Sequence, residues 1–460
     1  MNIKEIIYNN SPIFIQNIMV SMYGFQLKKL RYGVHFKKRL DLLRLTRNSN
    51  RNKIANYQEN KLKETINKSI QHVSYYKSHY SDKLEQDSVQ AFDLLAKLPI
   101  LTKDNLRNFS NDIKADNISN VTVISTSGTS GTPLNVITTK EAIQINYAFF
   151  WNFLESVGIN FGDRSVTFAG RNIIPPSQTR PPFWRKNWSM NNMLCSTYHL
   201  SKENIPYYIK AMESFNPRLI DSYPSAIYTI ALYILENKIK HQVRPKAIVT
   251  SSETLLEPQR KAIEEAFNCT VYDQYGSAEM CVFAAQCENG SYHVHPEYGY
   301  LEVVDENGKK TSSGNIGNLL CTSLINPAMP LIRYQIGDSG ILSNKKCACG
   351  WETQILQSIE GRLDDMIVTP SGKKVGRLDP IFKGLSNIKE TQIEQDRPDR
   401  VVVKIVPLEN FNKETTSEHL KKELRNRLGD DIEVLFTYPK EIEKTKSGKF
   451  RSVISTFNKN

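Results

Sequence analysis

The alternation of apolar and polar positions divides the chain into regions of different character. Residues 1–100 are polar and mostly of helical period, most clearly over 61–80. From residue 121 onward, short β-branched runs alternate with amphipathic segments, for example a strand predicted at 247–251 followed by a helix predicted at 258–267. Alternation of this kind favours an α/β fold, in which helices cover a parallel or mixed sheet.

The pattern becomes β-rich from about residue 293, with strands predicted at 300–304, 317–324 and 331–336. After Gly361 it changes to short strands and a helix, which is typical of a small α+β unit. We therefore predict an α/β protein with a large multi-subdomain N-terminal domain, in which mixed sheets are covered by helices beside a β-rich subdomain, and a small α+β C-terminal domain. The predicted regions are a basic helical region at 1–100, a main domain at 101–361 and a C-terminal domain at 365–460.

Composition limits the class of protein. With 460 residues, 40% of them hydrophobic, the chain is long enough for two or three domains. No apolar run reaches the roughly 18 residues that span a bilayer, and the apolar stretch at 12–15 lacks the basic start and cleavage site of a signal peptide. The seven cysteines are odd in number and scattered, which does not indicate a disulfide framework. We expect a cytoplasmic protein, with peripheral attachment to the inner membrane face as the alternative.

The net charge of +12 is unevenly distributed. Between residues 28 and 54 there are ten lysines and arginines and one acidic residue, Asp41, so this segment carries nine of the twelve positive charges. Such a segment forms a solvated helical face, or it attracts an anionic membrane surface or an anionic glycan intermediate. Nucleic acid is disfavoured as a partner because no nucleic-acid-binding motif accompanies the charge. The sequence does not indicate an oligomeric state.

Two loops far apart in the chain carry candidate chemistry. The first is rich in hydroxyls and glycines and ends at Pro133; its residues are Ser125, Thr126, Ser127, Gly128, Thr129, Ser130, Gly131 and Thr132. Glycine lets backbone N–H groups approach a phosphate closely, and the hydroxyls add donors. It is not a Walker A loop, which requires a Gly-Lys-Ser/Thr ending. The second loop, 444–449, places Lys449 on a turn beside Gly448. Together the loops indicate that a nucleotide triphosphate is held at one loop and approached by a lysine from the other.

Four further motifs occur in a recognisable order: Tyr275-Gly276-Ser277-Ala278-Glu279, Arg333-Tyr334-Gln335-Ile336-Gly337-Asp338, Gly361-Arg362-Leu363-Asp364-Asp365, and the turn ending at Lys449. With the hydroxyl-rich loop, this set resembles the adenylate-forming (acyl-activating) ligase superfamily. Within it, the chain resembles the phenylacetate–CoA ligase-like branch, including relatives found with capsular polysaccharide biosynthesis. The resemblance covers residues 95–460.

The resemblance implies that a carboxylate attacks the α-phosphate of ATP, giving an acyl-adenylate and pyrophosphate. It assigns the hydroxyl-rich loop to the β- and γ-phosphates, Lys449 to the transition state and Glu279 to Mg²⁺. It further implies that Asp364 is the hinge about which a mobile C-terminal lid rotates. The remaining nucleotide-binding residues that it implies are Tyr275 at the adenine, Gly276 and Ser277 beside it, Asp338 at the ribose, Arg362 at the ribose or phosphate, and Ser252 and Glu253 between nucleotide and acyl group.

One departure from the family pattern concerns the phosphate loop. Many relatives carry a lysine next to the loop's proline, whereas Thr132-Pro133-Leu134 leaves that place uncharged. Neutralisation of the phosphates would then depend more on Mg²⁺ and on Lys449.

A separate set of residues suggests a metal centre. Cys287 and His293 are followed far along the chain by Cys347 and Cys349, and two thiolates in a Cys-x-Cys turn with an imidazole suit tetrahedral Zn²⁺. Some phenylacetate–CoA ligase-like proteins carry a similar site. His295 is an alternative ligand because residues two apart on a strand face the same side. The competing interpretation is a pair of reduced, buried thiols.

The acid and the acceptor are less well defined. Segments expected at the acyl pocket include 168–171, 184–188, 198–199 and 223–225, which mix aromatic residues with Arg171, Arg185 and His199 and, nearby, Arg180. They favour a polar or anionic acid, such as a sugar acid or an amino-acid-like acid. The resemblance implies transfer of the acyl group to the thiol of CoA, or alternatively to an amine acceptor to form an amide. A catalytically idle scaffold in a glycan-assembly complex is a third hypothesis, which the joint presence of Glu279, Asp338, Arg362 and Lys449 disfavours.

Overall fold

The structure is a computed structural model. It describes residues 3–47, 49–80, 90–125, 134–175, 178–362, 367–370, 374–375, 378, 381, 388–443 and 450–456. None of the described helices combines the length and the apolar character needed to cross a bilayer.

The N-terminal region is helical, as predicted. Its helices are α1 (Ile3–Asn10), α2 (Ile13–Arg31), α3 (Val34–Thr46), α4 (Arg51–His72), α5 (Ser74–Tyr80), α6 (Ala91–Lys97) and α7 (Lys103–Asn108). The helix predicted over 61–80 is interrupted, because Val73 is extended and buries its side chain between α4 and α5. Thr102 forms a capping box with Asn105 at the start of α7, satisfying N–H groups that the helix leaves unpaired.

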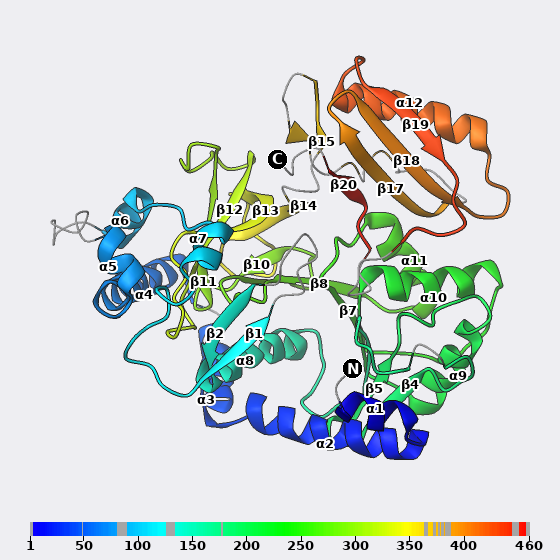
Figure 1. The fold of residues 1–460 in the computed structure, drawn as a ribbon, viewed down its shortest axis with the longest axis horizontal. Coiled ribbons are helices and arrows are strands. Elements are labelled where there is room, and N and C mark those ends of the chain that lie inside the picture. Colours follow the sequence, from blue (N-terminus) through cyan, green and yellow to red (C-terminus); the bar gives the residue numbers. More distant parts are fainter. Residues whose placement is uncertain are drawn as a thin grey trace.

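A single mixed sheet of twelve strands forms the centre of the molecule (Figure 1). Its strand order is β11-β12-β13-β14-β10-β9-β8-β7-β6-β3-β5-β4. The parallel part consists of β3 (Ser165–Phe168), β5 (Asn192–Cys195), β6 (Leu219–Ser222), β7 (Ala247–Ser251) and β8 (Val271–Gly276), with β4 (Trp184–Asn187) antiparallel at the edge. The alternation of strands and helices therefore predicted the α/β class correctly.

Helices cover both faces of the parallel strands. Helix α8 (Lys140–Ser156) packs with α3 against one face, through Phe149 and Phe153. Helices α9 (Ile205–Phe215), α10 (Pro224–Glu236) and α11 (Glu257–Phe267) bury their apolar sides against the other. Because both faces are covered, the parallel strands are apolar along much of their length, as in Ala247–Ser251.

The β-rich part continues the same sheet. Its strands are β9 (Phe283–Gln286), β10 (Tyr292–Val294), β11 (Gly299–Val304), β12 (Ile316–Ser323), β13 (Tyr334–Ser343) and β14 (Ile355–Arg362), all in antiparallel pairs. The strand predicted at 331–336 begins only at Tyr334. Arg333 has a φ of 47°, which interrupts the extended backbone before β13.

Three smaller sheets complete the fold. Strands β1 (Val121–Ser125) and β2 (Asn135–Thr139) form an antiparallel hairpin. Near the C-terminus, β17 (Ile388–Arg397), β18 (Arg400–Pro407), β19 (Glu433–Thr437) and β20 (Val453–Ser455) form a four-stranded sheet that packs on α12 (Lys413–Leu428). The short pair β15 (Ile367–Val368) and β16 (Lys374–Val375) lies beside it. This C-terminal unit has its own apolar core and sits on one side of the body in Figure 1.

Candidate active site

The structure joins two predicted nucleotide residues directly. Tyr275, near the end of β8, donates its hydroxyl to the Asp338 carboxylate on β13 at 2.6 Å. Burial, followed by the charge of Asp338, raises the pKa of Tyr275 well above its usual value, so the phenol stays a donor at neutral pH. This bond fixes one carboxylate oxygen of Asp338 and leaves the other available to a ligand hydroxyl.

Glu279 lies in the turn that follows β8. Its side chain is buried and accepts a hydrogen bond from the Tyr334 hydroxyl at 3.1 Å. Tyr334 stands at the start of β13, four residues before Asp338, so the same strand positions both predicted carboxylates. A buried carboxylate held by one neutral donor keeps acceptor capacity for a cation, which is what a magnesium ligand needs.

The hydroxyl-rich loop connects the two strands of the β1–β2 hairpin. Ser125 ends β1 and donates its hydroxyl to the Asn135 side chain at 2.7 Å, which closes the base of the loop. The predicted residues Thr126, Ser127, Gly128, Thr129, Ser130 and Gly131 lie outside the described residues. The hairpin is anchored near Glu279, because Thr138 on β2 contacts the sulfur of Met280 at 3.8 Å.

Arg362 ends β14, where its backbone pairs with Asp338 on β13. These two predicted nucleotide residues are therefore neighbours across a sheet ladder although they are distant in sequence. The predicted hinge residue, Asp364, and the predicted catalytic lysine, Lys449, lie outside the described residues.

Ser252 and Glu253 follow β7 at the carboxyl edge of the parallel strands. The Glu253 carboxylate accepts hydrogen bonds from the backbone N–H and the hydroxyl of Ser225, at 3.0 and 3.1 Å, in the first turn of α10. The same carboxylate also accepts the backbone N–H of Phe450 at 2.6 Å. Phe450 directly follows the predicted catalytic lysine in sequence, and this contact joins it to the main domain.

A cavity of about 630 Å³ begins beside these residues. Its floor is one face of the parallel strands, because alternate residues of a strand face the same side. The floor residues are Ser165 and Thr167 on β3, Asn192 and Leu194 on β5, Leu219 and Asp221 on β6, Ser251 on β7, and Gln274 and Gly276 on β8. Ser252 and Ser277 also line the cavity, so it is continuous with the predicted nucleotide-binding motifs.

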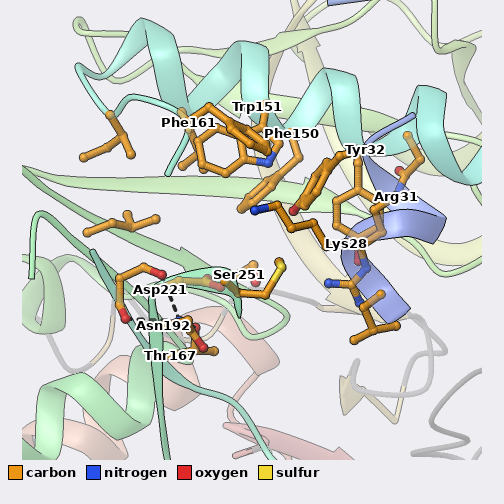
Figure 2. A pocket seen from close by; sticks show the side chains of 18 of the residues that line it. Lys28, Arg31, Tyr32, Phe150, Trp151, Phe161, Thr167, Asn192, Asp221 and Ser251 are labelled. Atoms are coloured by element: carbon orange, nitrogen blue, oxygen red, sulfur yellow. Dashed lines mark hydrogen bonds between the residues drawn. The ribbon is translucent and has the colours of Figure 1, made fainter. Parts of the chain in front are cut away.

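The wall opposite the floor is aromatic and basic (Figure 2). Helix α8 and the loop after it supply Phe150, Trp151 and Phe161, and α2 supplies Lys28 and Arg31. The cavity therefore offers aromatic surface together with charged and polar groups, an arrangement that fixes a ligand's orientation as well as binding it.

Asp221 is the acidic group on the cavity floor that the sequence analysis did not identify. Burial raises its pKa to about 6, and the positive charge of Arg171 opposes this only partly. Among the described residues, no side chain or backbone group donates a hydrogen bond to its carboxylate. Its position at the carboxyl end of a parallel strand, where ligands bind in open α/β sheets, is the signal that could have identified it.

Several residues expected at the acyl pocket lie elsewhere. Arg171 and Trp188 do line the cavity, but Arg180, Arg185 and His199 do not. Arg185 is fully buried and instead donates to the side chains of Gln16 and Gln178 and to backbone carbonyls of Pro182 and Trp184. His199 stacks on Phe183, with ring centroids 5.2 Å apart. The local sequence could not separate these packing roles from ligand contact.

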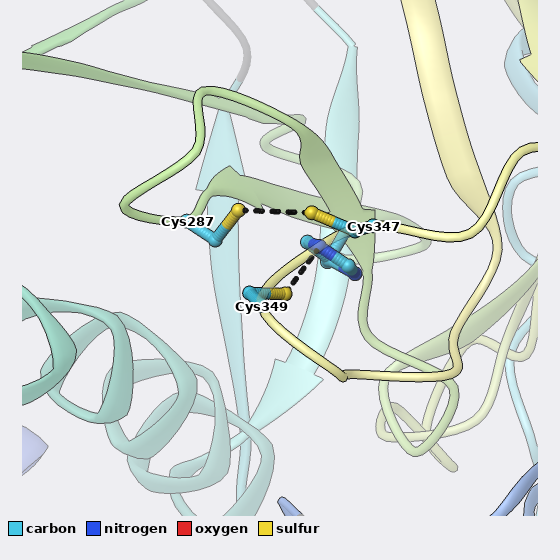
Figure 3. A group of neighbouring side chains, drawn as sticks. Cys287, Cys347 and Cys349 are labelled. Atoms are coloured by element: carbon cyan, nitrogen blue, oxygen red, sulfur yellow. Dashed lines mark hydrogen bonds between the residues drawn. The ribbon is translucent and has the colours of Figure 1, made fainter.

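The four residues predicted to bind zinc converge on one point (Figure 3). The ligand atoms of Cys287, His293, Cys347 and Cys349 all lie within 4.8 Å of one another. The sulfurs of Cys287 and Cys347 are 3.6 Å apart, and the Cys349 sulfur lies 3.3 Å from Nε2 of His293. Three sulfurs and one imidazole nitrogen at these separations fit a tetrahedral Zn²⁺ site.

The second nitrogen of His293 is also positioned. Its Nδ1 lies 2.9 Å from the Thr353 hydroxyl, and its ring stacks on Trp351 at 4.9 Å. A partner on the second ring nitrogen is the usual way in which a metal-binding histidine is oriented. His295, the alternative ligand, is not in the cluster; its ring packs against Phe149, Phe283 and Trp351.

Comparison with known proteins gives consistent results. The family model of the CapK C-terminal domain matches residues 367–456. Protein CapK of Staphylococcus aureus is 30% identical over 457 residues, which cover 98% of this chain and 98% of that protein. Phenylacetate-coenzyme A ligase of Pseudomonas putida is 23% identical over 415 residues, which cover 88% of this chain and 87% of that protein.

Among solved structures, 2-hydroxyisobutyryl-CoA ligase in the postadenylation state, in complex with R3-HIB-AMP, matches with a TM-score of 0.71 and 20% identity, covering 89% of this chain and 91% of that one. The same ligase in the thioesterification state covers the same shares with a TM-score of 0.56. The fold is that of the adenylate-forming, AMP-producing acid ligases. The chain belongs to the CapK family, within the phenylacetate–CoA ligase-like branch of that superfamily.

Proposed function

We propose that the protein activates a carboxylic acid with ATP and transfers the acyl group to CoA, in surface polysaccharide biosynthesis. A carboxylate oxygen bonds to the α-phosphorus, the bond between the α-phosphorus and the bridging oxygen breaks, and pyrophosphate leaves. The thiol of CoA then loses its proton to solvent and its sulfur bonds to the acyl carbon, while the bond between that carbon and the phosphate oxygen breaks and AMP leaves. The observation that carries the proposal is the continuity of the 630 Å³ cavity with the motif that holds the Tyr275–Asp338 pair.

In the first step, different residues would bind different parts of ATP. The hydroxyl-rich loop beginning at Ser125 would bind the outer phosphates, Asp338 the ribose and Tyr275 the adenine. Glu279 would hold Mg²⁺, which neutralises the phosphates, and Lys449 would bridge the carboxylate and the α-phosphate. Glu279 is buried and Tyr275 is partly buried, which limits the access of water to their polar contacts and strengthens them.

The position of the C-terminal domain supports the view that this conformation is suited to adenylation. The Glu253–Phe450 bond joins the C-terminal domain to the main domain at the residue that directly follows Lys449 in sequence. Agreement is also better with the postadenylation state of 2-hydroxyisobutyryl-CoA ligase than with its thioesterification state, at equal coverage. Transfer to CoA would then follow rotation of the C-terminal domain about Asp364.

The cavity supports a polar acid. Asp221 is an acceptor without a protein donor among the described residues, so a hydroxyl or ammonium group of the substrate would satisfy it. The facing rings of Trp151 and Phe161 would pack against the apolar face of the same molecule. A hydroxylated sugar acid or an amino-acid-like acid has this combination of groups, and phenylacetate does not.

We further propose that the cluster of Cys287, His293, Cys347 and Cys349 binds a structural Zn²⁺. Cys287 follows β9, His293 lies on β10, and the other two cysteines lie between β13 and β14. A metal there would join neighbouring strands of the β-rich part to the loop that leads into β14. Closed four-ligand sites of this type stabilise folds rather than activate water.

Pyrophosphate release, measured with ATP, Mg²⁺ and a panel of carboxylic acids, tests the proposal. Polar acids should give release above background, and phenylacetate should give less. Mass analysis of the products with CoA or with amines then distinguishes the thioester from the amide alternative. Absence of release with every acid, by a protein that nevertheless binds ATP, would favour the scaffold hypothesis.

A further inference from the structure

Helix α2 has an unusual distribution of polar and apolar residues. Its inner side contacts β4 and the turn after it through polar groups. Asn17 accepts a hydrogen bond from the Lys186 backbone at 2.9 Å, and Ser21 accepts one from the Trp188 backbone at 3.0 Å. Gly24 lies so close to the Asn187 side chain that an added Cβ would meet it at 2.3 Å. These contacts with β4 and the turn after it are thus polar or involve a small residue, whereas Leu30, near the end of the helix, packs on the core beside α8.

The outer side of α2 is apolar. Phe14, Ile18, Met22 and Phe25 recur at spacings of four, four and three residues, so they form one stripe along the helix, which we call the outer stripe. Phe14 is 64% exposed, Met22 62% and Phe25 51%. A surface helix normally turns its apolar stripe toward the core and its polar side toward water. On α2 the outer stripe is instead exposed.

Neighbouring residues extend this surface. Trp188, itself half exposed, packs on Phe14 with ring centroids 6.0 Å apart. Ile6 and Ile7 of α1 and Val34 and Leu45 of α3 are also exposed. In Figure 1, α1, α2 and α3 lie along one edge of the body, on the side opposite the C-terminal domain. An exposed apolar surface of this extent marks an interaction site rather than scattered surface residues.

The charges around the outer stripe are positive. Lys29 stands over the ring of Phe25 at 4.6 Å, and Lys37 and Lys38 are exposed on α3. These three lysines form no ion pair with any acidic residue that the structure describes. Arg44, by contrast, is neutralised by Asp41 and Glu155.

We propose that the outer stripe and the lysines around it form a docking surface for an anionic lipid bilayer. Apolar and aromatic side chains on an interfacial helix enter the headgroup boundary, while lysines pair with anionic headgroups. A second copy of this chain fits less well, because a two-fold contact would place like charges opposite each other. The opposite position of the C-terminal domain leaves it free to rotate while the body is bound.

The inner side of α2 also forms part of the acyl cavity, through Lys28 and Arg31. Docking would therefore place the cavity wall next to the membrane surface. This position suits an acid that is carried on a lipid. The docking proposal itself does not depend on the proposed ligase reaction.

Co-sedimentation of the full-length protein with vesicles tests it, comparing phosphatidylcholine alone with phosphatidylcholine that contains 30% phosphatidylglycerol. We expect binding to the anionic vesicles that weakens as salt is raised. The triple variant Lys29→Gln, Lys37→Gln, Lys38→Gln should bind about a hundredfold more weakly. Its control is Lys421→Gln, Lys422→Gln, Lys440→Gln, which removes three exposed lysines of the C-terminal domain, on the opposite side of the molecule, and should bind like the unaltered protein.

A second variant tests the apolar part. Phe14→Ser, Met22→Ser, Phe25→Ser should bind anionic vesicles at least about tenfold more weakly, because less apolar surface enters the bilayer. Its control is Tyr207→Ser, Ile316→Ser, Leu435→Ser, three exposed apolar residues elsewhere. Circular dichroism and thermal melting confirm that the variants fold. The proposal is wrong if the protein does not bind anionic vesicles, or if the stripe variant binds them as the unaltered protein does. If vesicle binding is absent and light scattering shows a dimer that the stripe variant disrupts, the stripe is an interface between two copies of the chain.

Discussion

The Glu253 carboxylate accepts the backbone N–H of Phe450 at 2.6 Å, across 197 positions of sequence. It also binds both donors of Ser225 at the start of α10. Glu253 therefore connects the start of α10 in the main domain to Phe450, the residue after the predicted catalytic lysine. A charged acceptor in this place stabilises the observed orientation of the C-terminal domain.

Glu253→Ala should slow adenylate formation by about ten- to a hundredfold, because hydrogen bonds to charged groups contribute about 1.5–3 kcal/mol. Transfer from a preformed acyl-adenylate to CoA should change much less. ATP–pyrophosphate exchange and single-turnover transfer measure the two steps separately. Glu253→Gln keeps an acceptor oxygen, so its rate of adenylate formation should lie between those of the unaltered protein and Glu253→Ala. Equal slowing of both steps would contradict a role in domain orientation.

Lys449→Ala should lower the rate of adenylate formation by about a hundredfold or more, which is the size of effect seen when one preorganised charge is removed from a transition state. The thermal midpoint should not change, since the residue is predicted to act on the reacting groups. The same exchange assay measures the rate, and Lys446→Ala on the same turn is the matched control. A loss of comparable size in the control would point to damage to the turn.

Asp364→Pro should slow thioester formation rather than adenylate formation, which is the opposite of the effect expected for Glu253→Ala. Proline fixes φ at the predicted hinge, so rotation of the C-terminal domain should be impeded while the adenylating arrangement persists. We expect near-normal pyrophosphate exchange and slow thioester formation. If exchange and thioester formation fall by the same factor, Asp364 is not the hinge.

Purified protein should contain close to one zinc per chain by elemental analysis. Cys349→Ser should lose most of it and should melt at a lower temperature, because metal-binding free energy adds to folding free energy. Cys269→Ser, at a free cysteine outside the cluster, should keep the metal. Zinc-free protein with an unchanged melting temperature would show that the cluster is a set of packed thiols.

Asp221→Asn should stabilise the protein at pH 7.5 and change little at pH 4. Burial raises the pKa of Asp221 to about 6, above the value of about 3.9 in unfolded chains. Between these values the folded state binds more protons than the unfolded state, so the contribution to stability falls as pH rises through this window. Thermal midpoints at the two pH values measure the difference, and exposed Asp431 provides the control variant Asp431→Asn. A similar change at both pH values would contradict a buried, uncompensated charge.

The same variant should bind its acid substrate more weakly, because an amide cannot supply a charged acceptor. A residue that lowers stability and raises substrate affinity is what a binding site is expected to contain. Asp221→Asn should therefore raise the thermal midpoint and weaken substrate binding, which separates the effect of Asp221 on folding from its effect on binding.

Much of the fold could be predicted locally. Strand β7 was predicted with its observed bounds, 247–251, because an apolar β-branched run between turn residues has few alternatives. The prediction over 61–80 was less accurate, since a single extended residue, Val73, separates two helices without breaking the apolar period. Nor does periodicity show that β8 and β9 join the two sheet regions into one, because strand pairing is a long-range choice.

The sequence alone determined which chemistry the protein carries. Ordered motifs and the Cys/His set depend on residue type and order, and both are read directly from the sequence. Tertiary structure decided where those groups meet: Tyr275 with Asp338, and Glu253 with Phe450. It also decided that Asp221 faces a cavity and that the apolar side of α2 faces outward. The physical reason is that hydrogen bonds and burial depend on distances between elements far apart in sequence, which no local pattern of polar and apolar residues contains.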